Sequence, residues 1–256
     1  MKPRIVVLLN TKTKYKRVCF LLINLFLLFQ TTSICAQETI NSNSETSEQW
    51  ADMTLTKRLS EKWSFGGDFG LRTSFNNREF QQFYIRPRVN YRLTSRIDFS
   101  LGVGTFNTFR ENLFNIYEFR IYQDANVKWP KLGMFNILHR IRFEERFFNY
   151  STSTLNADFI WRARYMLGVR TDRFSMGGKE NWSAFLSLEP FLRLVEDSNE
   201  FLANNFRWDT ALSYQATEQL RVELHYILQT SELFNFVDTR VVEHIVRLRL
   251  FYRIKY

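Results

Sequence analysis

Residues 63–75 read WSFGGDFGLRTSF, and their side chains fall into two sets when every second position is taken. The odd positions are mostly aromatic or aliphatic, whereas the even positions carry Ser, Gly, Asp and Arg. Only an extended strand places alternate residues on opposite faces, because a helix would distribute them every 3.6 positions. The run is also longer than the five or six residues of a usual soluble strand. It suits the roughly nine to eleven residues that a tilted strand needs to cross a bilayer.

The same alternation recurs along the chain and is separated each time by turn residues. It predicts an all-β fold, a single transmembrane antiparallel up-and-down β-barrel over residues 50–256 with ten to twelve strands. Bacterial barrels of one chain have an even number of strands, so twelve is preferred although eleven candidates are visible. Short and long connections alternate, which places the short turns on the periplasmic side. The candidate strands lie near 50–59, 63–75, 81–93, 97–109, 116–129, 134–148, 155–171, 182–192, 204–214, 219–230 and 241–256.

The first 36 residues have a different composition. A basic region without acidic residues precedes the apolar run VCFLLINLFLLF at 18–29, and small or polar residues follow up to Ala36. This order predicts a signal peptide at 1–36, cleaved near Ala36, and the outer membrane of a Gram-negative bacterium as destination. A membrane anchor would need about 20 apolar residues, and Ile34 before Cys35 fits lipoprotein cleavage poorly. Residues 37–49 are polar and are expected to form a flexible lead.

The net charge of +9 depends largely on that leader. The chain has 35 basic and 26 acidic residues, and six of the basic residues precede Val18. The remaining 29 basic residues give the mature part a charge of only +3, so the basic balance does not indicate nucleic-acid binding. Both cysteines, Cys19 and Cys35, also lie in the leader. A disulfide framework and a thiolate metal site are therefore excluded from the expected mature chain.

Charged residues dominate one face of most candidate strands. An arginine at the bilayer midplane costs about 2–4 kcal/mol when it faces lipid, so these faces must line the interior, where opposite charges pair across strands. The surplus of arginine would favour small anions if the lumen conducts. The charged residues expected to line the lumen are Arg86, Arg88, Glu118, Arg120, Arg140, Arg142, Glu144, Asp158, Arg162, Arg164, Glu189, Arg247 and Arg249.

The chain ends in an amphipathic strand whose alternate residues include Tyr252 and Tyr256. A terminal strand that stops on an aromatic resembles the signal read by the outer-membrane insertion machinery, which is therefore an expected partner together with outer-membrane lipid. The alternative is an ordinary edge strand that happens to be last. Two prolines inside strands, Pro87 and Pro190, remove ladder donors and predict β-bulges.

Four segments carry a family resemblance. The sequences HRIRFEERFF at 139–148, RARYMLGVR at 162–170, LSLEPFL at 186–192 and EHIVRLRLFYRI at 243–254 resemble the domain of unknown function 2490 family. That family consists of outer-membrane-barrel proteins common in the Bacteroidetes, and the resemblance covers about Trp50 to Tyr256. It implies a barrel in the outer membrane. It implies no activity and no catalytic residues.

Several functions stay open at this stage. A narrow anion-preferring channel competes with a structural barrel plugged by its own charge pairs, because small barrels fill their interiors. Ser213 and His225 are both predicted to face the lumen, on neighbouring strands. A lipid hydrolase would need at least such a serine and histidine pair, but pairs like this also occur by chance in any barrel. A soluble lipid-binding barrel would instead bury its aromatic face. The sequence has no Gly-rich phosphate loop and no metal-ligand cluster, and no cofactor is expected.

Overall fold

The computed structural model describes residues 44–75, 80–111, 113–152, 156–194, 202–233 and 240–255. The signal peptide expected at 1–36 lies outside these residues. No helix among the described residues is long and apolar enough to cross a membrane. Twelve strands form one sheet: β1 (Ser44–Arg58), β2 (Trp63–Ser74), β3 (Phe80–Arg92), β4 (Ile97–Arg110), β5 (Ile116–Lys128), β6 (Phe135–Tyr150), β7 (Asp158–Thr171), β8 (Phe174–Met176), β9 (Lys179–Arg193), β10 (Leu202–Gln215), β11 (Leu220–Leu233) and β12 (Arg240–Ile254).

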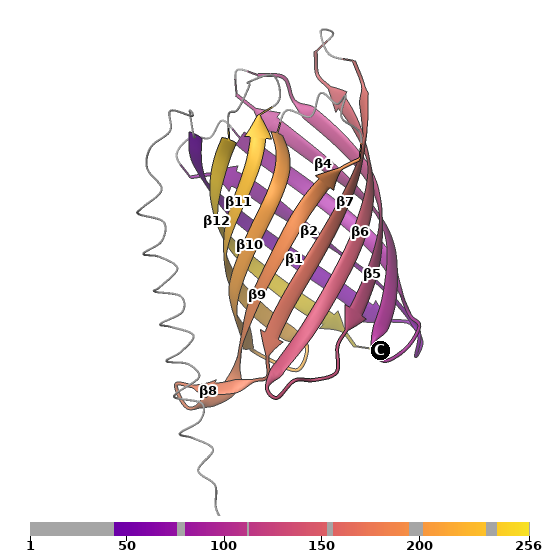
Figure 1. Cartoon of the computed structure of the whole chain (residues 1–256), viewed down its shortest axis with the longest axis vertical. Coiled ribbons are helices and arrows are strands. Elements are labelled where there is room, and N and C mark those ends of the chain that lie inside the picture. Colours follow the sequence, from indigo (N-terminus) through magenta and orange to yellow (C-terminus); the bar gives the residue numbers. More distant parts are fainter. Residues whose placement is uncertain are drawn as a thin grey trace, which may run out of the picture. The chain divides into compact units, whose positions relative to one another are not determined.

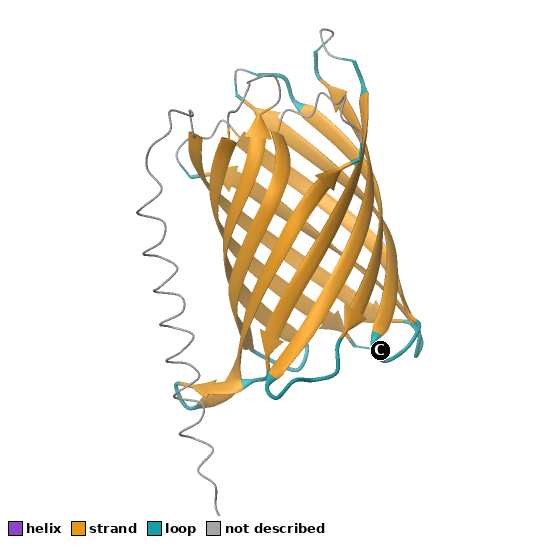
Figure 2. Ribbon diagram, in the orientation of Figure 1, coloured by secondary structure: helices purple, strands orange, loops and turns teal. Residues whose placement is uncertain are grey.

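Eleven of these strands close into a barrel, whose tilted strands are visible in Figures 1 and 2. Each strand of the wall pairs antiparallel with its neighbours in the chain, and β7 pairs directly with β9 because β8 lies outside the wall. The barrel closes where β1 pairs with β12, from Ser44–Val241 to Lys57–Ile254, and this pairing is parallel. The predicted all-β barrel of ten to twelve strands is confirmed. The argument from an even strand number does not hold for the wall, which has eleven strands.

The parallel seam follows from the direction of the first and last strands. We call the side of the barrel where β1 and β12 begin the loop end, and the side where they finish the short-turn end. Both strands run from the loop end to the short-turn end, so an odd number of strands closes the wall. The start of β1 and the last described residues therefore lie at opposite ends of the barrel.

The first strand begins earlier than the sequence predicted. We expected residues 37–49 to be a flexible lead, but β1 starts at Ser44. Residues 44–49 pair with β12, and Glu48 and Gln49 also pair with β2. This segment is polar, yet a strand between two partners gains its backbone hydrogen bonds whatever its side chains are. Thr46 and Glu48 line the interior of the barrel, where polar residues are tolerated.

The two faces of the wall differ sharply in chemistry. Large apolar side chains point outward and are exposed, as for Leu71 at 56% and Leu101 at 58%. At the short-turn end, aromatic residues of neighbouring strands lie side by side, with ring centroids 4.7 Å apart for Trp63–Tyr91 and 4.8 Å apart for Trp182–Tyr214. An apolar band bordered by aromatic residues is typical of the lipid face of a membrane barrel. A soluble lipid-binding barrel would have the reverse arrangement.

The connection from Asp172 to Asn181 is long for its end of the barrel because it forms a hairpin. The short strand β8 pairs with the first part of β9, outside the wall. Gly177 and Gly178 connect the two strands with φ values of 63° and 77°. Two consecutive residues with positive φ are typical of a type I′ hairpin turn, which glycine adopts without steric cost.

The predicted bulges at the two prolines are wrong. Pro87 pairs with Gly67 in β2, whereas the ladder to β4 is interrupted between Ile85 and Arg88 and resumes in the same register. Beside Pro190, the ladder from β9 to β7 is interrupted in the same way. The nearby register shift lies instead in β10, just before Phe206, the partner of Pro190. Each proline lacks a ladder donor, but no extra residue is inserted.

Gly67 allows the close approach of β2 and β3 beside Pro87. A Cβ at this position would lie 2.4 Å from the carbonyl oxygen of Arg86 and 2.8 Å from the Cα of Pro87. We expect Gly67→Ala to lower the free energy of unfolding by about 1–3 kcal/mol, because backbone atoms must move. Urea unfolding of the refolded barrel in detergent measures this change. Gly168→Ala is the control, since its Cβ would meet only side chains, the Phe185 ring at 3.0 Å and the Met166 methyl group at 3.6 Å; an equal loss in both variants would contradict the explanation.

Candidate functional site

The interior of the barrel contains a cavity of about 880 Å³. Its lining residues come from both ends of the barrel, from Arg110 and Leu113 at the loop end to Lys128 and Asn136 at the short-turn end. Among the described residues that line it are fifteen arginines and one lysine but only seven carboxylates. The cavity is therefore a strongly cationic space, although part of the charge is neutralised by the ion pairs described below.

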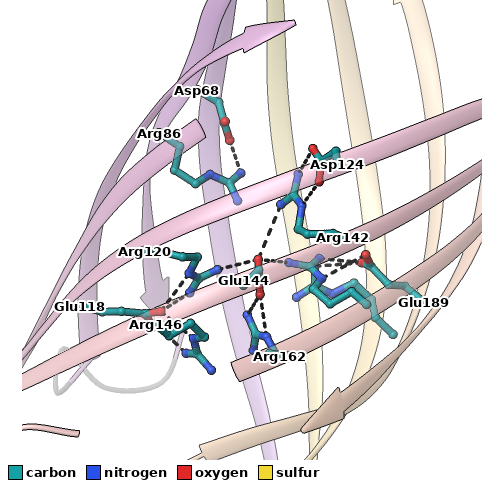
Figure 3. Close-up of polar contacts among 12 residues, drawn as sticks. Asp68, Arg86, Glu118, Arg120, Asp124, Arg142, Glu144, Arg146, Arg162 and Glu189 are labelled. Carbon is teal, nitrogen blue, oxygen red and sulfur yellow. Dashed lines mark hydrogen bonds and ion pairs between the residues drawn. The ribbon is translucent and has the colours of Figure 1, made fainter. Parts of the chain in front are cut away.

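The largest cluster of ion pairs surrounds Glu144 of β6, which is fully buried (Figure 3). Its carboxylate accepts hydrogen bonds from Arg120 of β5 at 3.1 Å and from Arg164 of β7 at 3.0 Å. Arg162 lies 2.6 Å away through Nη2, and Arg142 lies 3.8 Å away. One carboxylate thus holds guanidinium groups from three adjacent strands. Such charge-assisted bonds also fix the register of the strands that supply them.

Two further carboxylates extend this cluster along the wall. Glu118 accepts from Arg120 and Arg146, each at 2.6 Å. On the other side, Glu189 of β9 accepts from Arg140 at 2.5 Å and from Arg164 at 2.8 Å. Arg120 and Arg164 each bind two carboxylates, so the pairs form one connected network from β5 to β9.

Further pairs lie beside this network and elsewhere around the circumference. Arg142 binds Asp124 through two nitrogens, at 2.5 and 2.8 Å, and Arg86 binds Asp68 (Figure 3). At the parallel seam, Asp52 of β1 accepts hydrogen bonds from two arginines of β12. These are Arg247 at 2.5 Å and Arg249 at 2.8 Å, both through Nε. The seam is therefore closed by charged side chains as well as by backbone hydrogen bonds.

Aromatic residues also lie inside the barrel, although the residues predicted to line the lumen were all charged. Trp50, Tyr84 and Phe106 are almost fully buried and face the interior. Arginines stack on them: Arg120 lies 4.1 Å from the Phe106 centroid, and Arg72 lies 4.0 Å from that of Trp50. Cation–π contacts of this kind are stronger where water is excluded. These aromatics occupy the same alternate positions as charged residues of their strands, and this pattern in the sequence could have placed them inside.

The structure places most of the predicted lumen residues on the inner face. Arg86, Arg120, Arg140, Arg142, Arg162, Arg164, Arg247 and Arg249 enter the ion pairs with Glu118, Glu144 and Glu189 or with the neighbouring aspartates. Arg88 lines the cavity. Asp158 lies at the loop end of β7, where its carboxylate accepts from the backbone N–H of Phe159 at 2.8 Å. Tyr252 is exposed at the short-turn end, and Tyr256 lies outside the described residues.

The Ser213–His225 pair does not have the geometry of a nucleophile and its base. Ser213 donates to Glu223 at 2.5 Å rather than to the imidazole. The two ring nitrogens of His225 lie 2.7 Å from Asp209 and 3.0 Å from Glu223. With carboxylates at both nitrogens, the ring has no free acceptor for a serine proton. Within the described part of the chain, no group of three or more His, Cys, Asp or Glu side chains could hold a metal ion.

The fold and its interior define a β-barrel with an apolar outer face and an ion-paired, arginine-rich inner face. The family described as "Protein of unknown function (DUF2490)" matches residues 48–240. The chain belongs to this family, which confirms the resemblance over that range; the segment 243–254, which also suggested the family, lies beyond the match. No curated protein and no solved structure matches the chain.

Replacing Glu144 by Gln tests the central cluster. The change keeps the size of the side chain but leaves Arg120, Arg162 and Arg164 around a neutral amide. Removing one member of a buried ion pair costs about 3–5 kcal/mol, and we expect a loss of unfolding free energy of that order. Urea unfolding of the refolded barrel in detergent measures it.

The matched control is an exposed pair at the short-turn end. Asp172 lies 2.6 Å from Lys131, and the hydrogen bond from Lys131 lowers the pKa of Asp172. Both side chains are substantially exposed, so Asp172→Asn should cost no more than about 1 kcal/mol. If Glu144→Gln were as mild as this control, the cluster would not stabilise the barrel.

Proposed function

We propose that the protein is an outer-membrane β-barrel that forms a narrow pore with a preference for anions. The observation that carries the proposal is the cavity of about 880 Å³ with its surplus of arginines. A ring of cationic side chains attracts anions and repels cations at close range. A pore of this kind needs no metal, cofactor or catalytic residue, and we assign it none.

The proposed location is the outer membrane of a Gram-negative bacterium, after cleavage of the signal peptide near Ala36. The exposed apolar band supports contact with outer-membrane lipid, because a large exposed apolar surface is costly in water. The last strand, with Tyr252 and Tyr256, would be the segment recognised by the barrel insertion machinery. The long connections would then face the cell exterior, as is usual for such barrels.

The second candidate is a closed structural barrel without transport. It is favoured by the dense packing of ion pairs around Glu144, whose exposed fraction is 0%. These pairs join strands that are close neighbours in the wall, however, and they leave the cavity beside them. The geometry at Ser213 gives no support to the third candidate, a lipid hydrolase.

Planar-bilayer conductance separates the first two candidates. With purified barrel and a KCl gradient, we expect single-channel steps and a reversal potential displaced toward that of chloride. Absence of current at all voltages would contradict the pore and support the closed barrel. A reversal potential displaced toward that of potassium would contradict the anion preference. Heat-modifiable gel mobility of the same sample verifies that the barrel is folded.

Thiol labelling tests the orientation together with the parallel seam. The described residues contain no cysteine, so a single introduced thiol reports its own position. Glu45 is exposed at the loop end, and Glu61 is exposed at the short-turn end. A membrane-impermeant maleimide should label Glu45→Cys on intact cells, but Glu61→Cys only after permeabilisation. The opposite pattern would reverse the orientation, and equal labelling of both on intact cells would contradict insertion.

A further inference from the structure

Three arginines surround the indole of Trp50 inside the barrel. Their guanidinium carbons lie 4.0 Å from the ring centroid for Arg72 of β2, 5.3 Å for Arg207 of β10 and 5.6 Å for Arg247 of β12. We call these four residues the Trp50 cluster. All four line the cavity. Trp50, Arg72 and Arg247 come from β1, β2 and β12, three strands that are neighbours at the seam. The cluster therefore gathers three positive charges around one apolar ring.

Only one of the three arginines has a close carboxylate. Arg247 binds Asp52 at 2.5 Å, whereas Arg72 donates to the side-chain oxygen of Gln82 at 3.0 Å. The Nε of Arg72 is buried and has no hydrogen-bond partner within the described part of the chain. Buried charges in proteins are normally paired with an opposite charge. A guanidinium bound to a neutral amide thus has unused capacity to bind an anion.

Arg207 is in a similar position. Its Nε donates to the side-chain oxygen of Gln229 at 2.8 Å. Its nearest carboxylate among the described residues is Glu189, 3.8 Å from Nη1. Glu189 already accepts from Arg140 and Arg164 at shorter distances. It is therefore shared among three arginines and cannot neutralise Arg207 by itself.

Two carboxylates, Glu48 and Glu243, lie beside the cluster, and their hydrogen-bond partners are neutral groups. Glu48 accepts a hydrogen bond from the indole N–H of Trp50 at 2.6 Å. Glu243 accepts from Gln229 and from Ser231, the latter at 3.0 Å. Neither carboxylate forms an ion pair with Arg72 or Arg207 in the described structure. The glutamine that accepts from each arginine is itself held in place, because Gln82 donates to Thr108 at 2.7 Å and Gln229 donates to Glu243.

We propose that Arg72 and Arg207 form a binding site for an oxyanion, the carboxylate or phosphate group of a small solute. Planar guanidiniums match the paired oxygens of such groups, and the glutamines and the indole hold both arginines in place before the anion arrives. The cavity provides the space for the rest of the solute. The inference rests on the proposed pore only for the route by which anions reach the site.

Binding to the folded, full-length mature barrel in detergent tests this site directly. Inorganic phosphate and, in a separate titration, acetate are added at constant ionic strength, and heat release is followed by isothermal calorimetry. We expect saturable binding of at least one of the two, which also assigns the class of oxyanion. Arg72→Gln combined with Arg207→Gln should weaken that binding at least tenfold. Arg92→Gln, an exposed arginine at the end of β3, is the matched control and should bind as the wild type does.

The single variants Arg72→Lys and Arg207→Lys keep the charge but lose the planar fork, and each should weaken binding several-fold. They keep the test decisive if the double variant does not fold, which heat-modifiable mobility reports. Absence of saturable binding to the wild type would overturn the site, and so would unchanged binding by the folded lysine or glutamine variants. Saturable, arginine-dependent binding by a barrel that does not conduct would refute the pore and leave the site. Anion-preferring conduction with unaltered binding in the variants would refute the site and leave the pore.

Discussion

The constraint on which this barrel depends is the high cost of a guanidinium that is buried without a partner. An unpaired buried charge costs several kcal/mol, and an arginine facing lipid is also costly. The arginines of the alternating strands therefore lie inside, and most of them lie where a carboxylate meets them. Glu144 and Glu189 satisfy this requirement on one side of the wall, and Asp52 satisfies it at the seam. Because a slip of one residue would turn every arginine toward lipid, the ion pairs and the outer apolar face specify the same register.

The seam shows how charge and topology act together. Parallel pairing is slightly less stable per residue than antiparallel pairing, and it occurs here at the join between the first and last strands, which are far apart in sequence. Asp52 bridges this join to Arg247 and Arg249, and the indole of Trp50 lies over Arg247. Buried charge-assisted bonds therefore support the pairing with the highest entropic cost of closure.

Much of the fold could be predicted because the alternation of apolar and charged residues shows which side chains of a strand face outward and which face the interior. The strands expected over 97–109 and 116–129 occupy Ile97–Arg110 and Ile116–Lys128. The start of β1 was missed because its polar residues resemble a linker, and only its partners β2 and β12 make it a strand. The inward side chain of Trp50 was missed for a different reason. Aromatic residues are equally suited to contact with lipid, with the membrane interface and with stacked arginines. Their residue type therefore does not show which face of a strand they occupy, and only their alternation with neighbouring residues does.

The geometry of the pairs also bears on whether the interior is filled. Arg120, Arg162 and Arg164 reach Glu144 from strands immediately beside its own, so these pairs lie along the wall instead of crossing the lumen. A cross-strand pair needs only the short distance between neighbouring strands. One longer pair, Arg170 of β7 with Glu223 of β11 at 2.8 Å, spans the two strands between them. The arginines that do extend inward, such as Arg72 and Arg207, stack on aromatic rings and bind glutamine amides. The unneutralised charge is thus concentrated beside the cavity, where a mobile anion can compensate it.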